Sequence, residues 1–239
     1  MNCGRWFHGI ALVMALAGCA SVPTRDVRDP LEPLNRQIFR FNDALDAAIV
    51  KPVAVAYRDN MPVKFRQGIN NFFGNLEDAW SVVNNALQFK ARATLDSLVR
   101  VGINTTMGIA GVFDVASEME IERHTKDFGH TLGYWGLPAG PYLILPLLGP
   151  SSLRDAAALP VDWQGNLVNQ VDHVPTRNAS AVLRAIDTRA SLLKATSMLE
   201  DVALDRYTFT RDAYLQRRRN DIFDGNPPEE APEPETPGQ

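Results

Sequence analysis

The stretch FGHTLGYWGLPAGPYLILPLLGPSSLRD, residues 128–155, decides what kind of fold this chain can adopt. It combines closely spaced glycines and prolines with bulky apolar side chains. Each proline removes a backbone donor and clashes with the preceding helical turn, and solvated loops rarely carry so much apolar surface. The stretch therefore predicts an irregular apolar segment that packs against protein or lipid, with regular helices on both sides holding it in place.

The N-terminus has the layout of a bacterial lipoprotein signal. Arg5 and the amino terminus are positively charged, residues 10–17 are apolar, and the segment is too short to span a bilayer. Leu-Ala-Gly-Cys at 16–19 resembles a lipobox, which predicts that residues 1–18 are removed and that Cys19 carries the lipid anchor. The alternative is a plain signal peptide with a chance cysteine. Ala20 follows where an aspartate would signal inner-membrane retention, so the pattern favours the outer membrane.

The remaining composition separates a folded body from two flanking segments. Residues 19–28 are predicted to be a lipidated polar tether, 29–223 a single helical domain, and 224–239 a disordered acidic tail rich in proline. Without the leader and the tail the body is electrically neutral, which argues against a nucleic-acid partner. Cys3 leaves with the leader, so no disulfide is expected in the mature protein.

The first predicted helix follows the proline turns at 29–36. Apolar residues then recur every three or four positions as far as Ile49, and Pro52 would kink or end the helix. On this periodicity alone, Phe41 is an ordinary core residue and Asn42 a solvated amide.

Further amphipathic helices are predicted before and after the Gly/Pro stretch. An apolar stripe over 65–87 is about 34 Å long at 1.5 Å per residue, and a third helix follows from Lys90. Their apolar faces can lie either against a protein core or in the plane of a membrane interface. A long helix is expected from Asn178, and the arginines at 217–219 form either a solvated C-terminal turn or a lipid-headgroup patch.

Catalytic and cofactor motifs are missing from the sequence. There is no zinc-binding histidine pair, phosphate-binding loop, dinucleotide fingerprint or G-x-S-x-G motif, so no metal, no cofactor and no enzymatic activity are expected. Ser151 or Ser152 with His130 and Asp155 could form a hydrolytic trio, but such sets arise by chance in most chains.

Several motifs resemble the MlaA family, also called VacJ. The matching segments run in the family's order over about residues 29–219 and include Phe39 and Phe41-Asn42: DPLEPLNR at 29–36, NFFGNL at 71–76, NTTMGIAG at 104–111, FGHTLGYWG at 128–136, GPY at 140–142, LPLLGP at 145–150 and RD at 154–155. His130 departs from the glutamine expected there.

The resemblance implies an all-α fold, in which a ring of amphipathic helices surrounds a central passage. It implies a lipoprotein on the periplasmic face of the outer membrane that moves phospholipid from the outer leaflet toward the periplasm. Its implied partners are phospholipid, a trimeric porin and a soluble periplasmic lipid carrier, and its effect is to maintain lipid asymmetry. The candidate passage or gating residues are Phe41, Asn42, Gly136, Gly140, Pro141, Tyr142 and Pro146. A lipid-acting hydrolase and a purely structural porin-associated lipoprotein remain alternatives.

Overall fold

The computed structural model describes residues 26–229, so the leader, Cys19 and most of the tail lie outside the described residues. The elements are α2 (Glu32–Leu45), a π-helix η1 (Asp46–Val50), α3 (Lys51–Asn60), α4 (Val63–Leu87), α5 (Ala91–Thr106), α6 (Val115–Glu118), α7 (Phe128–Tyr134), β1 (Tyr142–Leu145), β2 (Gly149–Ser152), α8 (Leu153–Gly165), a 3-10 helix η2 (Leu167–Gln170), α9 (Val174–Val202) and α10 (Arg206–Ile222). Helix dominates, which confirms the predicted fold class.

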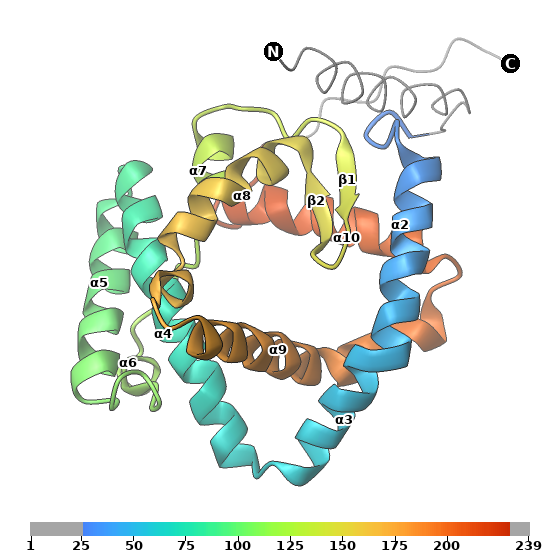
Figure 1. Ribbon diagram of the computed structural model, residues 1–239. Helices are drawn as coiled ribbons and strands as arrows, with labels where there is room; N and C mark the ends of the chain where they lie inside the picture. The colour runs from blue at the N-terminus through green and yellow to red at the C-terminus, as the bar shows by residue number, and fades with distance from the viewer. Residues whose placement is uncertain (1–25, 230–239) are drawn as a thin grey trace, which may run out of the picture.

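The helices form a ring because their contacts make a closed circuit (Figure 1). α2 continues through η1 into α3, α3 packs on α9, and α9 packs on α4. α4 contacts α7, α7 packs on α8, α8 contacts β2, and β1 returns the circuit to α2. α5 lies outside the ring against α4, and α10 runs behind α7 and the strands (Figure 1).

Helices α4 and α5 are inverted relative to helices of an ordinary globular core. Their buried side chains are largely polar or charged, namely Asn75, Asp78, Asn84, Asn85, Ser97, Arg100 and Asn104. Many apolar residues on their predicted faces are exposed instead: Phe65, Val83, Leu87, Leu95, Leu98 and Val99. A conventional apolar core is therefore wrong for this pair, whose arrangement matches the membrane-interface alternative. Within residues 26–229, no helix combines the length and apolar character needed to cross a bilayer.

Hydrogen-bonded charges hold α4, α5 and α6 together. Arg100, only 1% exposed, donates to the Asp114 carboxylate at 2.9 Å and is ion-paired with Asp78 at 3.4 Å. Burial by itself would raise the pKa of Asp114, but hydrogen bonds from Ser117 and Asn104 and the charge of Arg100 lower it to about 2. These ion pairs stabilise the contact only as a complete set, because removing one partner would leave a buried charge without compensation.

Two helix boundaries differ from the sequence predictions. Pro52 does not end the first helix: the chain passes through the π-helix η1 into α3. Proline has no N–H to donate to the preceding turn, and the wider π-helical turn before Pro52 accommodates the missing hydrogen bond. α9 begins at Val174, four residues before the predicted start, since Pro175 lies in the first turn, where its lost N–H is not needed.

The Gly/Pro-rich stretch is more regular than predicted. Residues 128–134 contain no proline and form α7, which is capped by Asp127 and His130 in a reciprocal capping box. Beyond the loop at 135–141, β1 and β2 pair antiparallel as a hairpin, with Tyr142 opposite Ser152 and Leu145 opposite Gly149. Only the loop and the turn of the hairpin remain irregular.

Candidate functional site

The hairpin is attached to α2 by two asparagine side chains. Asn35 donates from Nδ2 to the Tyr142 carbonyl and accepts from the Ile144 amide, both at 2.9 Å. Asn42 repeats the pattern: it donates to the Leu145 carbonyl at 3.0 Å and accepts from the Leu147 amide at 2.9 Å. Each side-chain amide therefore donates to one backbone carbonyl of the hairpin and accepts from the backbone amide two residues further on.

The spacing of the two asparagines matches the strand. Seven residues advance a helix by about 10.5 Å, and the three-residue separation of Tyr142 and Leu145, whose carbonyls the asparagines bind, advances a strand by about 10 Å. Seven residues also make nearly two full helical turns, so both side chains face the same way. Asn42 is thus not the solvated amide that periodicity alone suggested, and Asn35 belongs to the same site.

The turn of the hairpin carries exposed apolar residues. Pro146, Leu147 and Leu148 are all exposed, and Leu147 has a φ of +66°. A left-handed backbone is uncommon for a leucine, so the surrounding hydrogen bonds, including the one from Asn42, hold the turn in place. In Figure 1 the turn projects toward the middle of the ring. Phe41, beside Asn42 on α2, is 55% exposed.

The loop before the hairpin depends on its glycines. Gly136 and Gly140 have φ values of +90° and +68°, as positive-φ positions in the loop require. A Cβ on Gly140 would also lie only 3.1 Å from the Cβ of Leu153. Pro141 accepts a backbone hydrogen bond from Leu153 at 3.0 Å, which fixes the loop against the start of α8.

Tyr142 is a core residue. Its side chain is fully buried and packs with Ile144 and Tyr207. Burial is the largest cause that raises the pKa of its hydroxyl, and that hydroxyl has no hydrogen-bond partner among the described residues. Tyr142 therefore anchors the base of the hairpin rather than presenting a side chain to a ligand.

Arg218 joins the two ends of the Gly/Pro-rich stretch. Its guanidinium binds the Asp127 carboxylate at 2.6 and 3.0 Å and the Asp155 carboxylate at 2.8 and 3.0 Å. The Tyr214 hydroxyl donates to Asp155 as well, at 2.6 Å. Despite the cost of burial, the bonds and charges of these two carboxylates raise the pKa of Arg218. The prediction that this arginine run is solvated is correct for Arg217, which is 84% exposed, and wrong for Arg218.

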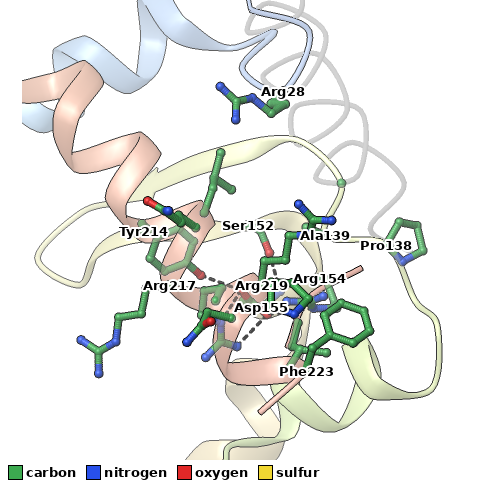
Figure 2. A pocket seen from close by; sticks show the side chains of 18 of the residues that line it. Arg28, Pro138, Ala139, Ser152, Arg154, Asp155, Tyr214, Arg217, Arg219 and Phe223 are labelled. Atoms are coloured by element: carbon green, nitrogen blue, oxygen red, sulfur yellow. Dashed lines mark hydrogen bonds and ion pairs between the residues drawn. The ribbon is translucent and has the colours of Figure 1, made fainter. Parts of the chain in front are cut away.

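A groove of about 1230 Å³ lies between this loop and the C-terminal half of α10. Gly136 to Gly140 line one side, and residues 212–220 and Ile222 of α10, with Phe223 just beyond the helix, line the other. Figure 2 shows Asp155, Tyr214 and Arg154 at its floor, joined by dashed contacts, with Pro138 and Phe223 at its edge.

The possible hydrolytic trio is occupied by structural contacts. Ser152 caps α8 by accepting from the Asp155 amide at 3.2 Å, and Ser151 donates to the Ser152 carbonyl at 3.3 Å. His130 accepts from the Asp127 amide at 3.1 Å, while Asp155 is engaged by Arg218. No group of three or more metal-binding side chains is present in the described part of the chain.

Helices that bury polar side chains against one another and expose apolar faces define a class of protein that lies at an apolar interface. Comparison with known proteins makes the assignment specific. The model of the MlaA lipoprotein family matches residues 27–221, and the chain belongs to this family.

Individual relatives agree with the family match. The chain is 38% identical over 208 residues to the intermembrane phospholipid transport system lipoprotein MlaA of Escherichia coli K12, covering 84% of this chain and 82% of that protein. It is 29% identical to the Haemophilus influenzae protein of the same description, covering 89% and 88%. A solved structure described as the structural basis for maintenance of bacterial outer membrane lipid asymmetry matches with a TM-score of 0.71 at 36% identity, covering 83% of this chain and 99% of that one. The resemblance to the MlaA family that the sequence motifs showed is confirmed.

Proposed function

We propose that this chain provides a passage for phospholipid from the outer leaflet of the outer membrane toward the periplasm and so maintains the lipid asymmetry of that membrane. The similarity to an intermembrane phospholipid transport lipoprotein and to a structure concerned with outer-membrane lipid asymmetry supports this assignment. The observation in this chain that carries it is the hairpin, whose apolar turn points into a ring of helices with exposed apolar faces (Figure 1).

The hairpin is the proposed gate of this passage. Its turn is bound to α2 through Asn42, while its base is fixed by Asn35 and by the buried Tyr142. Breaking the Asn42 hydrogen bonds would release the turn of the hairpin, while Asn35 and Tyr142 would hold its base in place. Phe41 and Pro146, both exposed, are proposed to line the space that the turn closes.

The anchor keeps the ring at the periplasmic face of the membrane. A ten-residue tether from Cys19 to Arg28 can reach about 35 Å when fully extended, so a lipidated Cys19 would hold the ring against the inner leaflet. Cys19→Ser should leave the precursor unprocessed or mislocalised, because several acyl chains anchor far more firmly than one interfacial surface. Mass spectrometry that finds an unlipidated mature terminus with full function would contradict the anchor.

A trimeric porin beside the ring and a soluble periplasmic lipid carrier are the proposed partners. The exposed apolar faces of α4 and α5 offer the surface for lipid or porin. We propose no catalytic step, since the serine, histidine and aspartate groups near the hairpin already cap helices or pair with Arg218.

Proteoliposomes containing the full-length protein and a labelled phospholipid test the proposal. With a soluble lipid acceptor outside, the protein should speed the appearance of intact labelled lipid over protein-free vesicles. Asn42→Leu should raise this rate by freeing the gate, while Gln37→Leu, which removes an exposed amide from the same helix, should not. No acceleration by the wild-type protein would contradict the passage. Lysophospholipid or free fatty acid that disappears in Ser151→Ala would instead establish a lipase.

A further inference from the structure

A second pocket lies on the outside of the ring, away from the hairpin. Its volume is about 790 Å³, and it is formed by the start of α5, the 122–126 segment, His130 of α7 and the C-terminal end of α10. Its floor contains two lysines, Lys90 and Lys126, whose side chains are 14% and 6% exposed.

The two buried lysines share one carboxylate. Lys126 Nζ is 2.8 Å from Asp224 Oδ1 and also donates to the Asp221 carbonyl. Lys90 Nζ is ion-paired with Asp224 Oδ2 and lies 4.7 Å from the centre of the Tyr134 ring. Within residues 26–229 the two ammonium groups thus share one half-exposed carboxylate as their ion-pair partner.

Lys90 also has unused hydrogen-bonding capacity. An ammonium group carries three donors, and within residues 26–229 Lys90 Nζ contacts the Asp224 carboxylate and the face of the Tyr134 ring, which leaves donors for a further acceptor. At the pocket rim, Arg217 and Arg92 are 84% and 90% exposed and pair with carboxylates only at 3.5 and 3.8 Å. The pocket can therefore offer several charged donors to an incoming anion.

The pocket borders an exposed apolar surface. Phe89, directly before Lys90, is 89% exposed and has a φ of +56°, so its ring is held away from the protein. Leu87 at the end of α4 and Leu95 in α5 are also exposed, and Trp135 donates to the Leu87 carbonyl at 3.2 Å. Positive charge and apolar surface therefore adjoin within a few residues.

We propose that the Lys90–Lys126 pocket binds the phosphate group of a phospholipid, whose acyl chains lie along the apolar surface around Phe89. The phosphate oxygens of the ligand accept hydrogen bonds from Lys90 and Arg217. They compete with the Asp224 carboxylate for the two lysines. The adjoining apolar surface selects a lipid headgroup over free phosphate. This site lies outside the proposed passage and holds a lipid at the rim of the ring.

Calorimetric titration of the full-length protein in amphipol, with three small ligands, tests the site. Dihexanoylphosphatidylglycerol carries both phosphate and acyl chains, dihexanoylglycerol carries only the chains, and inorganic phosphate carries only the anion. The wild-type protein should bind the phospholipid at least tenfold more tightly than either partial ligand. Inorganic phosphate binding as tightly as the phospholipid would overturn the lipid assignment in favour of a free-anion site, and equally tight dihexanoylglycerol would overturn the role of phosphate.

Two variants with opposite expected effects on phospholipid affinity make the test specific. Lys90→Gln should weaken phospholipid binding about tenfold, the value of one charge-assisted hydrogen bond. Asp224→Asn should strengthen it about three- to tenfold, because the competing charge is lost, while asparagine tolerates the φ of +51° at this position. Lys194→Gln, which removes an exposed lysine on α9, should change nothing. Unchanged or weaker binding in Asp224→Asn would overturn the proposal, even if the lysine variants failed to fold.

Discussion

Replacing Asn42 by leucine tests how the hairpin is held. Leucine has nearly the same size and a higher helix propensity, so α2 itself should not be weakened. The substitution removes the bonds to the Leu145 carbonyl and from the Leu147 amide. Two hydrogen bonds at about 0.5–1.5 kcal/mol each amount to about 1–3 kcal/mol, or roughly a 5- to 150-fold change in the population of the released turn.

The structure places the expected value near the lower end of this range. Leu147 is exposed, so water can replace the lost partner of its amide, whereas the two bonds of Asn35 are buried and remain. We therefore expect the backbone amides of the turn to exchange with deuterium about 5- to 30-fold faster. The amides of α4 and α5 should keep their protection, because no contact of theirs changes.

Hydrogen–deuterium exchange measured by mass spectrometry gives the readout. Gln37→Leu is the matched control, since it makes the same chemical change on an exposed position of α2. A folded Asn42→Leu protein with wild-type exchange in the turn would refute the idea that this asparagine holds the gate. Equal acceleration in both variants would also refute it.

Three further predictions concern stability. Arg218→Gln should lower the free energy of unfolding by about 3–5 kcal/mol, because it removes the arginine that Asp127 and Asp155 share and leaves Asp155 with Arg154 as its ion-pair partner, whereas Arg217→Gln should cost under about 0.5 kcal/mol; denaturant unfolding of the two variants measures the difference. Gly140→Ala should destabilise by about 1–2 kcal/mol through its positive φ, while Gly102→Ala, in a helix with open space around it, should stabilise by about 0.5–1 kcal/mol; equal melting temperatures for the two would contradict this. Because the folded pKa of Asp114 is lowered to about 2, its contribution is fully present above its unfolded value of about 4 and is lost as the pH falls from about 4 to about 2. Asp114→Asn keeps the helix cap and should flatten this part of the pH profile of the melting temperature.

Sequence patterns located the helices well but left open which face of each helix is buried. The stripe over 65–87 has a helical period, and α4 runs from Val63 to Leu87 without a break at Gly74. Period alone cannot tell a face that packs on protein from one that faces lipid, because both are apolar. The ion pair between Asp78 of α4 and Arg100 of α5 shows which face is buried. The polar face of α4 packs against α5, and the apolar face is left exposed.

The candidate site was recovered only in part. Gly136 and Gly140 were among the candidate residues of the Gly/Pro-rich stretch, and both have a positive φ. Asn35 stood in a recognised motif without an assigned role, although its spacing of seven residues from Asn42 was a usable signal. Arg218 could not have been found, because its two carboxylate partners lie far away in the sequence and an arginine run normally faces solvent.

The sequence by itself determined the helical periodicity, the positions where glycine and proline interrupt it, and the family to which the chain belongs. These follow from local chemistry: the backbone donors that proline lacks, the positive φ that glycine permits and the 3.6-residue period. Only the tertiary structure decided that the apolar faces of α4 and α5 point outward, that two asparagines bind a strand and that one arginine closes the Gly/Pro-rich stretch. Each of these depends on which distant backbone or charge a side chain meets, and the circuit of helix contacts sets that.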